Sequence, residues 1–129
     1  MKDLVEISVS IRCTDEDIDD IMCAALEGGV NYWCDKAVVE GEYLGEYASE
    51  QISRNGSLKF HTVEPFDDEE TEWYVLDKEK FMTGLKLFLE DPVRLAGAIC
   101  RDGLDPCNID AGDADTIIQL ALFGDIIYG

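Results

Sequence analysis

Residues 48–63 read ASEQISRNGSLKFHTV, and this stretch decides the class of fold that we predict. Asn55 and Gly56 form a dipeptide that is typical of a type I′ hairpin turn, because both residues tolerate the positive φ angles of that turn. After the turn, apolar and polar residues alternate, which is the period of a half-buried strand. We therefore expect strands at 48–53 and 58–63, paired antiparallel.

Three further segments show strand patterns. Residues 5–11 alternate apolar and polar side chains, residues 31–39 are rich in aromatic and β-branched side chains, and residues 73–76 form a short apolar run. Such segments fit a pleated, partly buried surface. Together with the expected hairpin, they predict a mainly antiparallel sheet of four or five strands.

Four segments carry the apolar spacing of amphipathic helices. These helices are expected at about residues 14–27, 78–90, 92–101 and 113–123. Thr14, Asp77 and Asp91 are suitable N-caps, and Gly124 is a suitable residue to end the last helix. No repeat or linker divides the chain, and its 129 residues are an ordinary length for one domain. We predict a single α+β domain over residues 1–129.

The charge balance limits the partners that the chain can have. It has 29 Asp and Glu against 10 Lys and Arg, a formal net charge of −19. Phosphate binding needs clustered basic side chains, so this composition argues against direct contact with nucleic acid or an anionic membrane. A basic protein is the partner that the charge predicts, although acidity can also serve solubility alone.

Many of the carboxylates fall in two short blocks, one on the first expected helix and one in an expected loop. The candidate partner-binding residues are Asp15, Glu16, Asp19 and Asp20 in the first block, and Asp67, Asp68, Glu69 and Glu70 in the second. Duplex DNA carries one negative charge per ~1.7 Å of its axis, and a protein can imitate this only with arrays of Asp and Glu. We therefore expect the carboxylates to form one contiguous face.

Aromatic residues are a second sign of a protein interface. Tyr43 and Tyr47 lie among acidic residues, and the adjacent pairs Tyr32-Trp33 and Trp73-Tyr74 place side chains on opposite sides of the chain. Exposed Tyr and Trp side chains are common anchors in interfaces. The alternative is that these rings only cover the sheet.

The five cysteines predict a location and a redox state. The chain opens directly on the alternating pattern without an apolar leader segment, and no run is long enough to cross a membrane. We expect a cytoplasmic protein with five free thiols. The cysteines lack zinc spacing, and no cofactor is expected.

Two acidic motifs resemble metal sites by composition. The stretch DEDIDD at residues 15–20 lacks the glycine and the distal glutamate of a calcium loop. The stretch DAGDAD at residues 110–115 is better explained as the cap and first turn of the last helix. We predict no metal site.

Catalysis has little support in the sequence. His61 is the only histidine, and we expect it to point outward from its strand. A nucleophile pair of Cys34 or Cys100 with His61 would define a small hydrolase, but no established catalytic motif accompanies these residues. We do not expect an enzyme.

Three longer strings suggest a family. GGVNYWC, EYASEQISRNGSLKF and DAGDADTIIQLALFGDIIYG resemble a family of small acidic proteins carried by phages and mobile elements of Firmicutes. The family has no known catalytic residues, so none is transferred. The resemblance implies a phage or prophage accessory protein in the cytoplasm of a bacterial host cell, similar to anti-CRISPR and other anti-defence inhibitors.

Two functions follow as hypotheses. The first is an acidic inhibitor that mimics DNA and binds a basic nucleic-acid-binding host defence protein, such as a CRISPR effector. The second is a homo-oligomeric sponge for an anionic nucleotide signal. That sponge would need at least two arginines to converge on one pocket, from the set Arg12, Arg54, Arg94 and Arg101.

Overall fold

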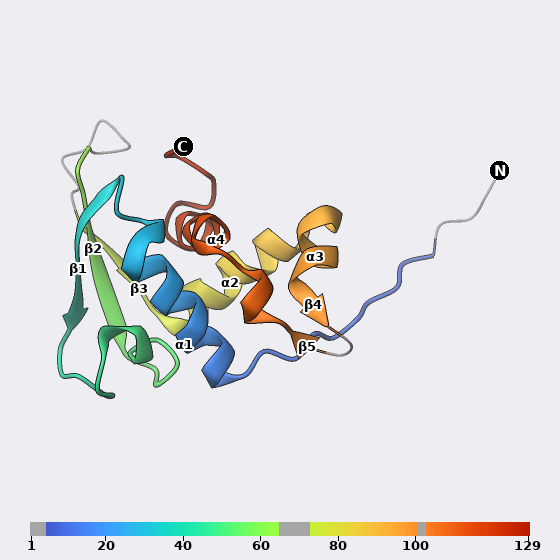
Figure 1. Ribbon diagram of the computed structural model, residues 1–129, viewed down its shortest axis with the longest axis horizontal. Helices are drawn as coiled ribbons and strands as arrows, with labels where there is room; N and C mark the ends of the chain where they lie inside the picture. The colour runs from blue at the N-terminus through green and yellow to red at the C-terminus, as the bar shows by residue number, and fades with distance from the viewer. Residues whose placement is uncertain (1–4, 65–72, 101–102) are drawn as a thin grey trace.

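The computed structural model describes residues 5–64, 73–100 and 103–129, and its elements confirm the α+β class (Figure 1). In chain order the elements are α1 (Asp15–Ala24), the π-helical turn η1 (Ala25–Gly29), β1 (Cys34–Glu40), the 3-10 turn η2 (Ala48–Glu50), β2 (Ser57–Thr62), β3 (Trp73–Leu76), α2 (Lys78–Leu89), α3 (Pro92–Ala98), β4 (Ile99–Cys100), β5 (Gly103–Leu104), the 3-10 turn η3 (Pro106–Asn108) and α4 (Ala111–Phe123).

The main sheet has three antiparallel strands in the order β1-β2-β3, so β2 is central. Val38 of β1 lies opposite Lys59 of β2, which lies opposite Val75 of β3. The strand β2 alternates between buried and half-buried residues, with Leu58 and Phe60 fully buried. The helices α1, α2 and α4 lie on one side of this sheet (Figure 1). A separate antiparallel pair joins β4 to β5.

One contiguous apolar core joins the helices to the inner face of the sheet. Its largest buried side chains include Trp33, Phe60, Phe81 and Phe88. The helices α2 and α4 pack closely, because Gly84 leaves room for the backbone of α4. In the described part of the chain, no helix has the length and apolar content needed to cross a membrane.

The helix boundaries follow the caps that the sequence contains. Thr14 and Asp17 form a capping box at the start of α1, and Asp77 and Asp91 cap α2 and α3. The helix α3 ends at Ala98, earlier than expected, because the next residues pair with β5. Gly124 ends α4 in the left-handed conformation, with a φ of 75°.

The expected hairpin at residues 55–56 is wrong. Residues 48–50 form the turn η2 instead of a strand, and β2 pairs with β1 and β3. Asn55 does have a positive φ of 68°, but the turn connects a buried loop to β2. Gln51 and Ile52 are buried, so this segment contributes to the core and does not form a sheet edge. A long-range strand pairing therefore replaced the local one that the dipeptide predicted.

The expected strand at residues 5–11 is also wrong. The segment runs away from the body of the molecule, and Val5, Ile7 and Val9 are 81%, 84% and 74% exposed (Figure 1). Among the described residues, its end is fixed by a bridge between Arg12 and Gly103. A strand needs a neighbour to satisfy its backbone groups, and the described chain places none beside residues 5–11.

Candidate acidic interaction surface

The helix α1 presents carboxylates to solvent because its opposite side is held in the core. Ile18, Ile21 and Met22 are almost fully buried, which fixes the rotation of the helix about its axis. Asp15, Glu16 and Asp20 are consequently exposed. The helix therefore holds these three candidate carboxylates on a rigid support.

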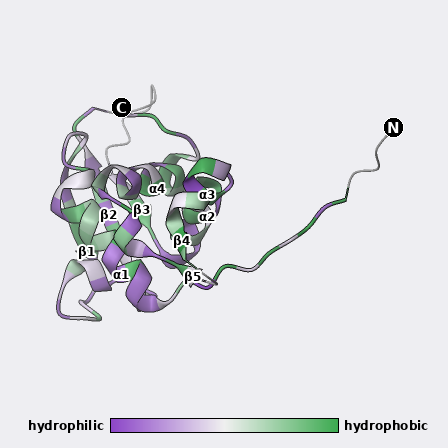
Figure 2. Cartoon of the chain, turned by 45° about the vertical axis from the view of Figure 1, so that its right-hand side comes forward, coloured by the Kyte–Doolittle hydropathy of each residue, from purple (hydrophilic) through white to green (hydrophobic). Residues whose placement is uncertain are grey.

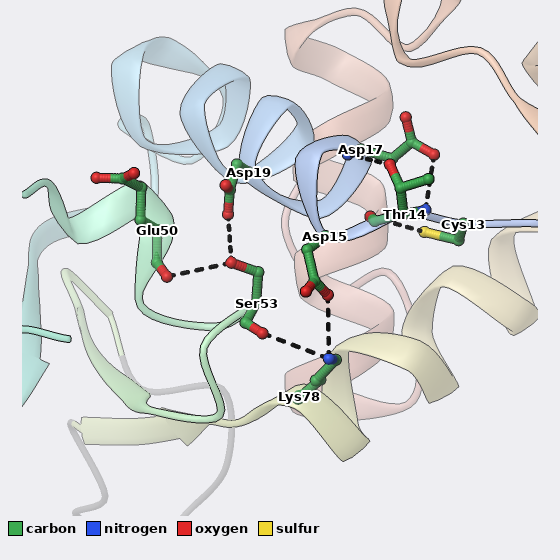
Figure 3. Close-up of polar contacts among 8 residues, drawn as sticks. All are labelled: Cys13, Thr14, Asp15, Asp17, Asp19, Glu50, Ser53 and Lys78. Carbon is green, nitrogen blue, oxygen red and sulfur yellow. Dashed lines mark hydrogen bonds and ion pairs between the residues drawn. The ribbon is translucent and has the colours of Figure 1, made fainter. Parts of the chain in front are cut away.

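Asp17 belongs to the helix start and not to the interaction surface. The hydroxyl of Thr14 accepts a hydrogen bond of 3.1 Å from the backbone N–H of Asp17, and the Asp17 carboxylate accepts one of 2.9 Å from the backbone N–H of Thr14 (Figure 3). This reciprocal capping satisfies two backbone donors that the first turn leaves unpaired.

Asp19 differs from its neighbours because it makes a tertiary contact. The hydroxyl of Ser53 donates a 2.5 Å hydrogen bond to its carboxylate, and Asp19 is half-buried (Figure 3). This bond ties α1 to the buried loop that follows η2. The candidate residue Asp19 therefore supports the surface from within, whereas Asp15, Glu16 and Asp20 form its exposed part.

Lys78 connects α2, on which it lies, to α1 and to the loop after η2. Its ammonium lies 3.2 Å from the carboxylate of Asp15 and donates to the backbone carbonyl of Ser53 at 3.3 Å (Figure 3). The Asp15 side chain is nevertheless 72% exposed. An exposed ion pair contributes little to stability, so Asp15 can contact a partner at small cost.

Glu50 is a carboxylate of this region that sequence reasoning missed. It accepts hydrogen bonds from the backbone N–H groups of Tyr47 and Glu46 at 3.0 and 2.9 Å, and Arg54 lies 3.5 Å away. The pKa of Glu50 is below its usual value, and the hydrogen bond from the backbone of Tyr47 is the main cause. The bonds from Glu46 and Arg54 lower the pKa further. The sequence has no standard capping signature here, because a capping box begins with Ser or Thr and Tyr47 precedes this turn.

Exposed aromatic side chains accompany the acidic residues. Tyr43 and Tyr47, in the segment before η2, are 61% and 62% exposed, and Leu44 is 47% exposed. The turn η2 packs against α1, so this segment continues the same region of the molecule. Carboxylates beside exposed tyrosines are suited to contacts with a protein, where tyrosine is an effective anchor.

The second predicted block, Asp67, Asp68, Glu69 and Glu70, lies outside the described residues. The structure therefore neither joins it to α1 nor separates it. Exposed carboxylates also occur elsewhere, for example Asp35 and Glu40 on β1, Glu79 on α2 and Glu90 after it. The described acidic residues are thus spread over the surface, with several of them on α1. They do not form the one contiguous face that the sequence predicted.

The other acidic motif, at residues 110–115, is used inside the protein. Asp110 caps α4 and forms a capping box with Asp113. Asp115 is buried and accepts 2.6 Å hydrogen bonds from the Trp33 indole and the Tyr32 hydroxyl. Within the described residues, no cluster of His, Cys, Asp or Glu has the arrangement of a metal site.

Of the residues of the hydrolase hypothesis, His61 and Cys34 each make a hydrogen bond to another group, and Cys100 is exposed. His61 Nδ1 lies 2.5 Å from the carboxylate of Asp35, and this bond is the main reason that the pKa of Asp35 is lowered. The thiol of Cys34 donates to the carbonyl of Lys36 at 3.1 Å, and burial raises its pKa to about 11. Cys34 is therefore a protonated thiol near neutral pH, which is the opposite of an activated nucleophile.

The described arginines have different neighbours. Arg12 lies beside β5, Arg54 beside Glu50, and Arg94 on α3 over the ring of Phe88. Arg101 lies outside the described residues. This arrangement does not favour the pocket that a nucleotide sponge would need.

The described structure is thus an α+β fold in which the helix α1 exposes several carboxylates. Comparisons of the chain with protein-family models, with curated proteins and with solved structures found no match.

Proposed function

We propose that this protein is an inhibitor that binds a basic nucleic-acid-binding protein and occupies its nucleic-acid site. The observation that carries the proposal is the exposure of Asp15, Glu16 and Asp20 on a helix whose other side is locked in the core. These residues span about 7.5 Å along the helix axis, at ~1.5 Å per residue. Fixed carboxylates at such spacing can replace phosphates against the lysines and arginines of a partner.

The net charge of −19 supports the proposal over a wider range of distance. A strongly acidic protein is attracted to a basic cleft and is guided toward it before contact. The exposed Tyr43 and Tyr47 would then supply the apolar part of the interface. We further propose that the target is a bacterial defence protein, such as a CRISPR effector.

The experiment compares two triple variants with equal charge change. Asp15→Lys, Glu16→Lys and Asp20→Lys reverse the surface on α1, whereas Glu40→Lys, Glu79→Lys and Asp125→Lys reverse exposed carboxylates on other parts of the molecule. Asp19 is left unchanged because its bond to Ser53 is structural. Both variants and the unchanged protein are immobilised and used to capture proteins from a bacterial lysate at low salt.

The proposal expects captured proteins that excess duplex DNA releases, because the two ligands compete for one site. The α1 variant should bind them at least about tenfold more weakly, and the control variant should lose much less. Circular dichroism verifies that both variants are folded. Captured proteins that DNA does not displace, or equal losses in both variants, would contradict mimicry through α1.

A further inference from the structure

The N-terminal arm, defined as residues 5–11, has the sequence of a strand. Ile11 packs against the core, whereas residues 5–10 are exposed and extend away from the body of the molecule (Figure 2). Its apolar residues share one side of an extended chain, because successive side chains of such a chain point in opposite directions. Val5, Ile7 and Val9 are each more than 70% exposed. Three large apolar side chains exposed on one side of an arm are costly in water, which indicates that another surface covers them.

The apolar side of the arm leads into a groove on the body. This groove has a volume of about 310 Å³, and Val9 and Ile11 line it where the arm joins the body. Its other apolar lining residues come from α2, α3 and β5, and they are Met82, Leu85, Leu89, Leu95 and Leu104. The arm and the groove thus form one continuous apolar surface.

The charge of this apolar surface indicates which kind of partner covers it. Residues 5–13 contain one acidic and one basic side chain, Glu6 and Arg12, and the groove contains Lys86 and Glu90, which also balance. A basic partner would find no excess of negative charge here. Two copies of a chain with a net charge of −19 repel each other least where their surfaces are neutral.

We propose that two copies of the chain associate through their N-terminal arms, which pair as antiparallel strands and cover the two grooves with their apolar sides. An antiparallel pair centred on Ser8 places Val5 opposite Ile11 and Ile7 opposite Val9. It also places Glu6 opposite Ser10 and not opposite a second Glu6, so like charges do not meet. The arms would pair over about 24 Å, at ~3.4 Å per residue.

The position of Arg12 is compatible with this register. The carbonyl of Arg12 already accepts a hydrogen bond of 2.9 Å from the backbone N–H of Leu104. A pair centred on Ser8 keeps the new strand within residues 5–11 and leaves that bond intact. Because an isolated two-stranded ribbon is marginal in water, the groove must supply the remaining stabilisation.

The test measures the mass of the full chain by sedimentation over about a hundredfold range of concentration. The unchanged protein should reach twice its chain mass of 14.4 kDa. Ile7→Asn with Val9→Asn should weaken dimerisation by roughly tenfold or more, because the apolar side is lost. Ser8→Asn with Ser10→Asn is the matched control, since it places the same side chains on the polar side and should still dimerise.

Salt and crosslinking separate this association from other contacts. Dimerisation should strengthen between about 0.05 and 1 M salt, because screening reduces the repulsion between two acidic copies. On oxidation, the Ser8→Cys variant should form a disulfide that joins position 8 of one copy to position 8 of the other, and peptide mapping identifies the linked peptide. A protein that stays at 14.4 kDa, a dimer that survives the Ile7/Val9 change, or a dimer without the linked peptide would overturn the proposal.

Discussion

The carboxylate of Asp115 on α4 accepts a 2.6 Å hydrogen bond from the indole Nε1 of Trp33, and the two residues are 82 positions apart in the chain. The Tyr32 hydroxyl donates to the other carboxylate oxygen of Asp115 at 2.6 Å, and the Gln119 amide lies 3.1 Å from both oxygens. The ring of Tyr128 stacks on Trp33. The buried Asp115 carboxylate thus links the segment before β1 to α4, and the Gln119 amide extends the network to the C-terminal tail by donating to the carbonyl of Tyr128 at 2.9 Å.

Replacing Asp115 should destabilise the fold strongly. Asp115→Ala leaves the buried Trp33 donor without its acceptor, and the expected loss in free energy of unfolding is about 2–4 kcal/mol. Asp125→Ala on the exposed segment after α4 is the control and should change it by less than about 0.5 kcal/mol. Urea unfolding followed by tryptophan fluorescence measures both. Similar stabilities of the two variants would show that the network contributes little.

The same network should make stability sensitive to high pH. The pKa of Tyr32 is raised to about 12 from an ordinary value of 10.0. Burial is the main cause, and the hydrogen bond to Asp115 is the second. A raised pKa in the folded state gives stability that is fully present below pH 10 and is lost as the pH rises toward 12. Between these values the unfolded tyrosine ionises more readily than the folded one.

Tyr32→Phe isolates this contribution. The unchanged protein should lose more stability than the variant between about pH 9 and pH 11, because only the former ionises at position 32 upon unfolding. Unfolding by urea at several pH values supplies the comparison. Parallel pH profiles for the two proteins would contradict the assignment to Tyr32.

The five cysteines should react in an order set by burial. Cys34 is buried and its pKa is raised to about 11, whereas Cys100 and Cys107 are exposed. All five are free thiols in the structure. A thiol reagent at neutral pH should therefore label Cys100 and Cys107 first and Cys34 last, as peptide mapping can show. A mass under non-reducing conditions below that of the fully reduced chain would instead reveal disulfides.

The helix crossing at Gly84 should not tolerate a side chain. A Cβ at this position would lie 2.6 Å from the Ile117 carbonyl oxygen and 2.7 Å from the Ala121 nitrogen, both on α4. Gly84→Ala should cost about 1–3 kcal/mol despite its better helix propensity. Gly97→Ala is the control, because its Cβ would meet nothing within 4 Å, and it should be neutral or stabilising. Thermal unfolding distinguishes the two outcomes.

Local signals in the sequence were sufficient for most of the helices. Thr14, Asp77 and Asp91 cap the helices that they were expected to cap, because capping depends on residues within one turn. Strand pairing is non-local, and the local turn signal at Asn55 predicted the wrong neighbour for β2. The alternation of residues 5–11 had no partner strand among the described residues that could make it a sheet strand.

The candidate surface was predictable to a similar extent. Helical spacing correctly placed Asp15, Glu16 and Asp20 away from the buried side of α1. The contact of Asp19 with Ser53 depends on how the loop after η2 folds onto α1, and no local pattern predicts it. The hydrogen bonds of Glu50 depend on the turn η2, which forms at residues where the sequence pattern predicts a strand.

Asp19 and Asp20 provide a test that separates structural from interacting carboxylates. The two residues are adjacent and carry the same side chain, but only Asp19 accepts the Ser53 hydroxyl, whereas Asp20 is exposed. Asp19→Asn should lower the free energy of unfolding by about 1 kcal/mol, because the hydrogen bond loses its charged acceptor. Asp20→Asn should change it by less than about 0.5 kcal/mol.

For partner binding, Asp20→Asn should have the larger effect and Asp19→Asn the smaller one if α1 mimics phosphates. Asp20→Asn removes a charge that faces the partner, so it should weaken binding at low salt and reduce the dependence of binding on salt. Asp19→Asn should affect binding less, because its carboxylate is already engaged by Ser53. Titrations of both variants against a captured partner at two salt concentrations measure these effects. A larger binding loss for the Asp19 variant would place the contact surface elsewhere and would count against the exposed side of α1.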